Sequence, residues 1–409
     1  MFELGPRSIS RKAAAALALL VLVLAVPGPA FAKKKKEAPA PAPAPKPIDY
    51  SKVQYPPPPE IARVRYVGDL YGAKLEPPPA KTKKAGWMDR MAGTQEDQRK
   101  GQRRLPPQLI RPLGMAVDSK GKLYVSDQKM GGIFIFNPET KDTEYIHNGR
   151  DARFSLVNGL AIDDNDRLFV ADGELHHVLV FDAQHKVTDE IHEGIQDPMG
   201  LAIDTENRFL YVVDAGLDQV LVYDADSYKL LRKIGTTGHN HELTTEGNFG
   251  GPFGAAVDKE GNLYVTDMLN NRIEVFDAEG SFVRTWGKIG DAPGEFGRPK
   301  GIAVDSDGHI WVADQALDRV TIFGNKGEVL MAFGTHGKFP SQFKGLVGVT
   351  IDKANRVFTV EQYPTGKVQI FRYTTQAEAQ AEFERRQAER EKKAAARSGT
   401  ENASAKEPQ

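Results

Sequence analysis

The stretch PFGAAVDKEGNLYVTDMLNNRIEVFDAEGSFVRTWG, residues 252–287, contains one full copy of the pattern that decides the fold. It opens on small Gly and Ala residues, runs to Asp258, and turns through a Lys-Glu-Gly sequence. Three further short segments follow, rich in Val, Tyr, Phe and Trp and separated by turn residues. Short apolar or alternating segments bounded by Gly, Asp and Asn are typical of antiparallel strands. The stretch therefore predicts a four-stranded antiparallel unit.

The opening part of this pattern occurs six times along the chain. Successive lead glycines are 41 to 54 residues apart, at Gly114, Gly159, Gly200, Gly254, Gly301 and Gly348. A period in the forties, made of short strands without helices, is typical of a β-propeller. We predict an all-β fold, a six-bladed β-propeller with four-stranded antiparallel blades over residues 112–373. The acidic residues that end the strands recur in every copy, so we interpret them as turn formers.

The sixth copy ends after its third strand, which leaves the last blade one strand short. Residues 62–68, ARVRYVG, read like the fourth strands of the other copies. We predict that residues 56–72 provide a strand that closes the last blade and removes an exposed edge. Residues 73–111 would then connect this strand to the first blade, with one short helix at 85–91. Within residues 374–409 we expect a charged surface helix over 375–397 and a disordered tail over 398–409.

Two copies resemble NHL repeats closely, VTDMLNNRIEVFD at 265–277 and VADQALDRVTIFG at 312–324. The interblade loop GDAPGEFGRPKG, residues 290–301, is also similar to that family. The resemblance covers about residues 112–373 and implies a six-bladed β-propeller, but it says little about function. Residues 56–72 look like the leading segment of a group of exported bacterial propellers. Some bacterial relatives accompany extracytoplasmic electron-transfer systems, and the resemblance implies such an association here.

The first 32 residues have the order of a secretory signal peptide. Basic residues precede an apolar run at 13–26, and the small-residue sequence Ala30-Phe31-Ala32 follows. The run is shorter than the roughly 20 residues that span a bilayer. We expect export to the periplasm or the medium, with an uncleaved anchor as the alternative. Residues 33–55 read as a linker rich in Lys, Pro and Ala. Membrane contact is expected only through an uncleaved signal or through Lys33–Lys36.

Composition excludes several kinds of chemistry. The chain of 409 residues has no cysteine, which excludes disulfides, Cys-ligated zinc, iron–sulfur clusters and thiol catalysis. The formal net charge of -1 conceals a basic stretch at 33–111 and an acidic one at 112–373. Residues 112–373 contain 26 Lys and Arg against 39 Asp and Glu. An acidic ring argues against nucleic acid and suggests docking of a cationic protein.

The loops between blades and those between second and third strands should emerge on one face of the propeller. Binding at that face is the usual arrangement, so we take its side chains as candidates. They are a polar mixture without a convergent set of one type, and no residue is assigned a catalytic role. The candidates are Lys129, Asn158, His176, His177, Met199, Asp218, Asn270, Lys300, Asp318 and Arg319.

A metal site is considered because some catalytic NHL propellers resemble zinc lyases with channel histidines. Catalytic zinc needs three protein ligands and one open position. No His recurs at one inner-strand position here, so that ligand set cannot be carried over. His239 and His241 form an H-x-H pair in the longest interblade loop and are the candidate metal ligands. No cofactor is predicted, and a zinc or calcium ion is left open.

These observations favour an exported, non-enzymatic propeller that is a monomer and a rigid binding platform for protein partners in the cell envelope. No nucleic acid partner is expected. The alternative is a metal-dependent lyase or lactonase-type enzyme with its site at the central channel.

Overall fold

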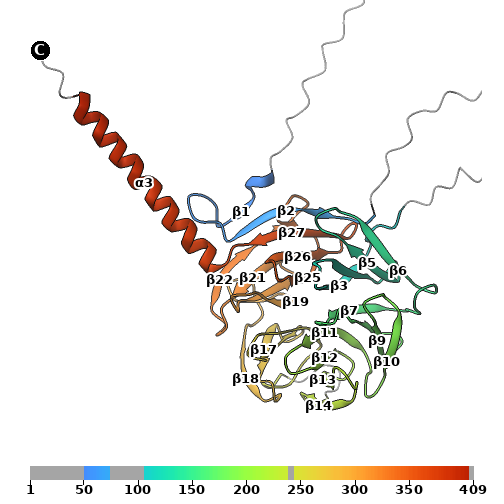
Figure 1. The fold of residues 1–409 in the computed structure, drawn as a ribbon. Coiled ribbons are helices and arrows are strands. Elements are labelled where there is room, and N and C mark those ends of the chain that lie inside the picture. The colour runs from blue at the N-terminus through green and yellow to red at the C-terminus, as the bar shows by residue number, and fades with distance from the viewer. Residues whose placement is uncertain (1–49, 74–105, 238–243, 405–409) are drawn as a thin grey trace, which may run out of the picture. The chain divides into compact units, whose positions relative to one another are not determined.

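The computed structural model describes residues 50–73, 106–237 and 244–404. Within them, six antiparallel sheets form the four-stranded blades of a β-propeller, and one of these sheets has a short fifth strand at its outer edge (Figure 1). This confirms the fold that the repeats predict. The signal peptide, most of the linker and the helix expected at 85–91 lie outside the described residues.

Each blade runs from an inner strand to an outer one. The inner strands are β3 (Pro112–Val117), β7 (Val157–Ile162), β11 (Pro198–Asp204), β15 (Pro252–Val257), β19 (Pro299–Val304) and β25 (Leu346–Ile351). The second strands are β4 (Leu123–Asp127), β8 (Leu168–Asp172), β12 (Phe209–Asp214), β16 (Leu263–Asp267), β20 (Ile310–Asp314) and β26 (Arg356–Glu361). We number the blades one to six in this order.

The third strands are β5 (Gly132–Phe136), β9 (His177–Phe181), β13 (Gln219–Asp224), β17 (Arg272–Phe276), β21 (Arg319–Phe323) and β27 (Lys367–Tyr373). The fourth strands of the first five blades are β6 (Thr143–His147), β10 (Val187–Ile191), β14 (Leu230–Ile234), β18 (Phe282–Trp286) and β22 (Val329–Phe333). A small parallel pair, β23 (Thr335–His336) and β24 (Gln342–Phe343), lies between blades five and six.

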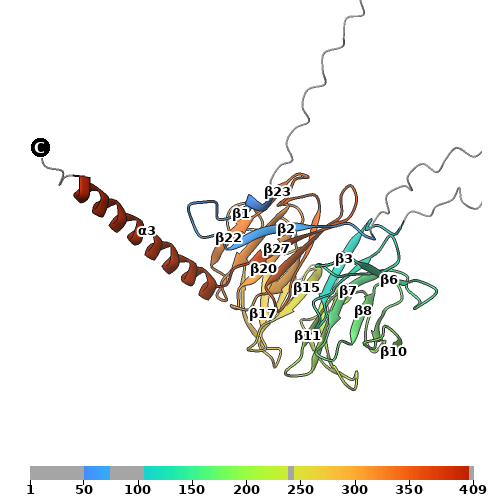
Figure 2. The ribbon, with the colours of Figure 1, turned by 45° about the horizontal axis from the view of Figure 1, so that its top comes forward.

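The sixth blade takes its fourth strand from the N-terminal part of the chain. Strand β2 (Val64–Leu70) pairs antiparallel with β27, from Val64 opposite Tyr373 to Leu70 opposite Val368. Figures 1 and 2 both show β2 lying along β27. Val64 is fully buried in the apolar cluster that joins blades five and six. The closing strand predicted at 62–68 is therefore present, and it begins and ends two residues later than predicted.

Two flanking segments differ from their expected outlines. Residues 50–55, expected as the end of a linker, contain a 3-10 helix η1 (Tyr50–Lys52) and strand β1 (Gln54–Tyr55), which pairs with β2. The pairing arises because β2 would otherwise present its outer edge to water. Helix α3 (Gln376–Ser404) extends past the predicted end of the helix near 397. No helix among the described residues is long and apolar enough to cross a bilayer.

The lead glycines are required where neighbouring inner strands approach closely. A Cβ atom on Gly114 would lie 2.3 Å from the carbonyl oxygen of Asn158 in the next blade. The equivalent atom on Gly301 would lie 2.5 Å from Gly348 Cα. Because such contacts are below van der Waals distance, any other residue would push adjacent blades apart. The inner strands contact one another in the order β3, β7, β11, β15, β19, β25 and back to β3, so the ring is closed.

Apolar side chains fill the space between each pair of neighbouring blades. Six separate buried clusters result, one for each interface. The largest fully buried side chain, Trp311, packs edge-on against Phe333 of its own blade and against Tyr373 across the interface with blade six. Burying a side chain of this kind contributes about 1.5–3 kcal/mol. Such an arrangement holds each blade through its two neighbours.

Candidate functional site

The propeller has two distinct faces. We call one the loop face. It consists of the loops after the second strands (128–131, 173–176, 215–218, 268–271, 315–318, 362–366) and the loops between blades. The turn face carries the turns that follow the inner strands, beginning at residues such as Asp118 and Asp163. The central channel runs from one face to the other along the inner strands.

Buried carboxylates hold the loop face in place. Asp127, at the end of β4, accepts hydrogen bonds from the backbone N–H groups of Ile110 (2.6 Å) and Arg111 (3.0 Å). The same bond type recurs in the other blades, and in blade six Glu361 replaces the aspartate and accepts from Lys344 N–H at 2.6 Å. Each of these acids accepts a hydrogen bond from the backbone of the preceding loop, as their recurrence in every copy predicts.

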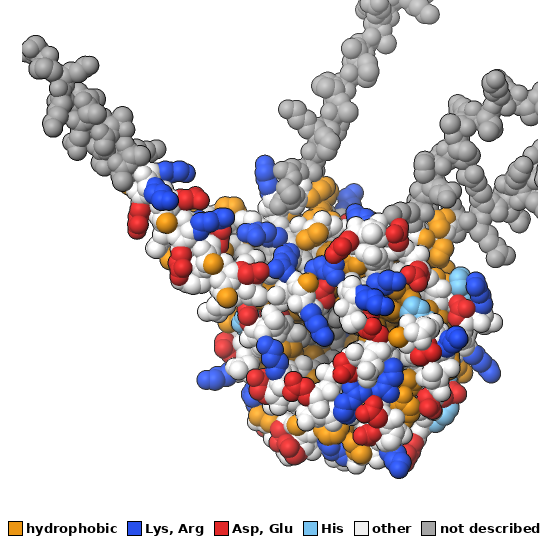
Figure 3. Space-filling model, in the orientation of Figure 1, with side chains coloured by type: hydrophobic (Ala, Val, Ile, Leu, Met, Phe, Trp, Pro, Cys, Tyr) orange, Lys and Arg blue, Asp and Glu red, His pale blue; other side chains and the backbone are white. Residues whose placement is uncertain are grey.

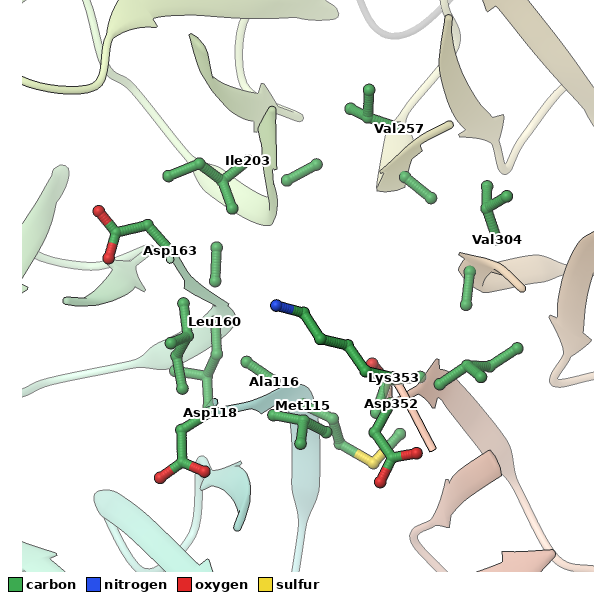
Figure 4. Close-up of a pocket in the computed structure, with 18 of the residues that line it drawn as sticks. Met115, Ala116, Asp118, Leu160, Asp163, Ile203, Val257, Val304, Asp352 and Lys353 are labelled. Carbon is green, nitrogen blue, oxygen red and sulfur yellow. The ribbon is translucent and has the colours of Figure 1, made fainter. Parts of the chain in front are cut away.

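The channel widens toward the turn face into a cavity of about 530 Å³. Aliphatic side chains such as Ile203, Val257 and Val304 line its wall, and the amino group of Lys353 points toward its centre (Figure 4). The carboxylates of Asp118, Asp163 and Asp352 point away from the centre. Their oxygens accept bonds from their own turns, such as Lys122 N–H to Asp118 at 2.8 Å. Sequence reasoning did not single out Lys353, because a lysine in a turn is normally solvated.

The opposite mouth of the channel lies at the loop face and contains the candidates Met199 and Lys300. The ammonium nitrogen of Lys300 lies 4.7 Å from the ring centroid of Phe253. Burial, together with the nearby charges of Arg298 and Arg111, lowers the pKa of Lys300 to about 8. Such a lysine can bind an anionic group or lose its proton near neutral pH. Met199 and Phe253 line the narrow part of the channel behind it.

Three other candidates are structural. Asn158 is completely buried, accepts from Gln128 Nε2 at 2.8 Å and donates to the carbonyl of Pro198 at 2.9 Å. Asp318 is buried and accepts from the N–H groups of Gly345 and Leu346. Asp218 is buried and accepts from Gly251 N–H at 2.9 Å. Their side chains hold strands and loops together and are not presented to a partner.

Four candidates lie in or beside the loops of this face. Lys129 and His176 are exposed, and Asn270 is half-buried. Asn270 donates to Asp267 at 2.8 Å. Arg319 is half-buried, and its guanidinium donates to the carbonyls of Asp291 and Glu295 in the preceding interblade loop. The structure spreads these four residues over different blades and does not bring them into one site.

His177 belongs to a different group of side chains. It starts β9, is buried, and its Nδ1 lies in direct contact with a carboxylate oxygen of Glu190 in β10. His192 Nε2 lies 3.3 Å from the same carboxylate oxygen. Sequence reasoning marked His177 but missed Glu190 and His192, because they follow in a different strand. The other predicted metal ligands, His239 and His241, lie outside the described residues.

A second buried polar group occupies the position equivalent to His177 in blade four. Arg272 Nε lies 2.8 Å from Asp267 and 2.9 Å from Glu274. Its terminal nitrogens donate to the carbonyls of Thr244 and Asn248 in the long interblade loop. Burial raises the pKa of Glu274 to about 7 although the charge of Arg272 opposes this. This group connects the loop to the blade.

The acidic excess of residues 112–373 is located mainly inside the propeller. Thirteen of the 39 acidic side chains are buried in the described structure, against two basic ones, Arg272 and Lys367. On the face seen in Figure 3, Lys and Arg side chains are interspersed with Asp and Glu side chains. Most of the excess therefore consists of buried carboxylates at turns and strand ends. Because these carboxylates are not at the surface, they do not produce the acidic docking surface that the sequence suggests.

Family models match two parts of the chain. The SMP-30/gluconolactonase/LRE-like region matches residues 178–288, and the NHL repeat matches residues 296–323. Human NHL repeat-containing protein 2 is 31% identical over 93 residues, which is 22% of this chain. The match spans only 13% of the human protein's own length.

Solved structures share the fold at low sequence identity. A protein of unknown function from Bacteroides thetaiotaomicron has a TM-score of 0.52 and 16% identity, covering 65% of this chain and 71% of that one. A gluconolactonase from Xanthomonas campestris has a TM-score of 0.49 and 18% identity, over 64% and 86% of the two chains. Virginiamycin B lyase from Staphylococcus aureus has a TM-score of 0.47 and 15% identity, over 64% and 95%.

Proposed function

This chain is a six-bladed β-propeller of the NHL-repeat family, and we propose that it is a rigid binding platform that engages a protein partner through its loop face. The proposal places the partner in the cell envelope, because the first 32 residues have the order of an export signal. The resemblance to exported bacterial propellers suggests an extracytoplasmic electron-transfer complex as the partner.

The observation that carries the proposal is a set of exposed apolar side chains on the loop face. Buried carboxylates fix the backbone of this face through hydrogen bonds. Six large apolar residues of the loop face are exposed: Tyr71, Ile110, Leu269, Ile289, Phe339 and Tyr363. Ile289 alone is 76% exposed. A partner that covers these side chains would remove their apolar surface from water, which favours association. Because buried carboxylates fix the loops that carry them, little loop ordering would oppose binding.

The mouth of the channel adds positive charge to this face. Lys300 is flanked by Arg298 and Arg111, and each of these charges acts on its pKa. A partner that contacts the mouth should therefore offer a carboxylate or another anionic group beside an apolar patch. Charge complementarity of this kind orients partners and raises association rates.

The test compares two leucines of similar exposure on different parts of the surface. Leu269 lies in the loop face and is 50% exposed, whereas Leu231 lies on the outer strand β14 and is 47% exposed. We expect Leu269→Glu to weaken crosslinking to one envelope protein about tenfold or more, as for a central interface residue. Leu231→Glu should leave it unchanged. Equal capture by both variants and the wild type would contradict the proposal.

A second candidate is hydrolysis or elimination on a small substrate in the channel, with a metal ion as cofactor. It is supported by the match of residues 178–288 to the SMP-30/gluconolactonase/LRE-like region. The cavity of about 530 Å³ is large enough for a small ligand. Lactone hydrolysis measured with and without added Zn²⁺ or Ca²⁺ tests this candidate. A rate that Lys353→Ala and Lys300→Ala leave unchanged would argue against chemistry in the channel.

A further inference from the structure

Three potential metal ligands meet on one side of blade two. In the pairing of β10 with β9, Ile191 lies opposite Val178 and Glu190 opposite Leu179. The next pair in this register is His192 opposite His177. Residues two apart in a strand share a face, and directly paired residues share it across strands. His177, Glu190 and His192 therefore project from the same side of the sheet.

Distances within this group are short. One ligand atom from each residue can be chosen so that all three lie within 4.8 Å of one another. The two imidazole rings are 5.4 Å apart, and both contact the same carboxylate oxygen of Glu190. The Nε2 atom of the buried His177 has no hydrogen-bond partner among the described residues. The nitrogen that faces Glu190 is Nδ1, so Nδ1 is the atom of His177 that this group offers to a metal.

The position of His177, the first residue of the third strand, is used differently in other blades. The equivalent position holds Arg272 in blade four and Arg319 in blade five, and both hold the preceding interblade loop through its carbonyls. The loop before blade two is held differently, by Asn148, which bonds both the N–H and the carbonyl of Phe154. His177 is thus not needed to fasten a loop, and its imidazole is directed to Glu190.

From this geometry we propose that His177, Glu190 and His192 bind a zinc ion. Two imidazoles and one carboxylate form a three-ligand set that zinc accepts, with a fourth position left for water or another ligand. The side chains of Glu190 and His192 are about half exposed, so this fourth position faces solvent. The group lines a cavity of about 390 Å³ that also includes Arg153. Arg153 can hold an anion that completes the coordination.

To test the proposal, the purified protein is loaded with Zn²⁺ and dialysed exhaustively. Its zinc content is then measured by elemental mass spectrometry. We expect one zinc per chain. His192→Ala and Glu190→Gln should each weaken zinc affinity more than about tenfold, since even outer-shell partners contribute about 10- to 100-fold. Both positions are partly exposed, so these variants should fold, and circular dichroism checks that they do. Added zinc should raise the unfolding temperature of the wild type but not of His192→Ala.

His147 provides a matched control in blade one. It lies opposite Gly132 in the pairing of β5 with β6, the same register position that His192 has in blade two, but without an imidazole across from it. His147→Ala should retain zinc in full. A double His239→Ala, His241→Ala variant should also retain it, and loss of the ion from that variant would assign zinc to the interblade loop. Two results would overturn the proposal: no zinc in the wild type, or as much zinc in His192→Ala and Glu190→Gln as in the wild type. Either would show that Glu190 only accepts hydrogen bonds from two histidines.

Discussion

Blades two and four have different residues at the same position, the first residue of the third strand. In blade four Arg272 is buried between Asp267 and Glu274 and donates to loop carbonyls. In blade two His177 contacts Glu190 and His192 and no loop carbonyl among the described residues. The difference shows that one backbone position can fasten a long interblade loop or, where the loop is short and self-supported, become available for chemistry.

The largest effect should come from breaking the polar group of blade four. Arg272→Ala leaves Glu274 and Asp267 buried without their cation. Removing one partner of a buried ion pair costs about 3–5 kcal/mol. Urea unfolding measures the loss. Combining Arg272→Ala with Glu274→Gln should recover part of the stability, and a loss below about 1 kcal/mol for the single variant would contradict the structural role of Arg272.

The pH dependence of stability should also be traceable to blade four. Because the pKa of Glu274 is raised to about 7, the folded chain holds that proton more tightly than the unfolded chain, where the value is 4.5. The stability this provides is fully present below about pH 4.5 and is lost as the pH rises through about 7. The shift corresponds to at most about 3 kcal/mol.

Glu274→Gln removes this titration. The stability of the variant relative to the wild type should therefore increase as the pH rises from 5 to about 8. Unfolding free energies of both proteins at the two pH values measure this difference. A difference that does not change with pH would contradict the raised pKa of Glu274 and leave Arg272 as a simple ion-pair partner.

A smaller effect is expected in blade five, where the equivalent arginine is only half-buried. Arg319→Ala removes hydrogen bonds to the carbonyls of Asp291 and Glu295, but water can replace them. We expect a loss of about 1 kcal/mol. Thermal unfolding measures it. If Arg319→Ala lost as much stability as Arg272→Ala, the contribution of Arg272 would come mainly from its hydrogen bonds to the loop. Its pairing with the buried carboxylates would then contribute little.

The smallest effect on stability should come from giving blade two the residue of blade four. An arginine fits this position in two other blades, and in blade two it could pair with Glu190. His177→Arg should therefore change the free energy of unfolding by less than about 1 kcal/mol while abolishing zinc binding. Unfolding and zinc content are measured on the same preparation. Retained zinc would show that His177 is not a ligand.

Much of the fold could be read from the sequence because each blade repeats the same local pattern. The alternation and turn residues specify the four strands, and the truncated sixth copy points to the strand at 62–68. The pairing of β1 with β2 could not be read, because Gln54 and Tyr55 follow a Pro-rich stretch without strand periodicity. The end of α3 was missed for a similar reason, since Ala, Glu and Arg continue past residue 397 without a clear stop signal.

The candidate site was less accessible to sequence reasoning. His177 could be marked from its loop, but its partnership with Glu190 and His192 depends on the register of β10 against β9. That register includes an irregularity between Val187 and Asp189. A shift of one residue would place Glu190 on the other side of the sheet. The pattern Glu-x-His opposite His was present in the sequence, but nothing local sets which residues face each other.

The sequence by itself determined the number of blades, the four-stranded unit and the turn role of the recurrent acids, since these depend on local periodicity and turn chemistry. Only the tertiary structure decided which charges are buried and which side chains meet. The carboxylate of Glu274, the amino group of Lys300 and the imidazole of His177 acquire their properties from neighbours in other strands or blades. Those neighbours are set by strand register and by the close approach of blades, which no single segment of the chain contains.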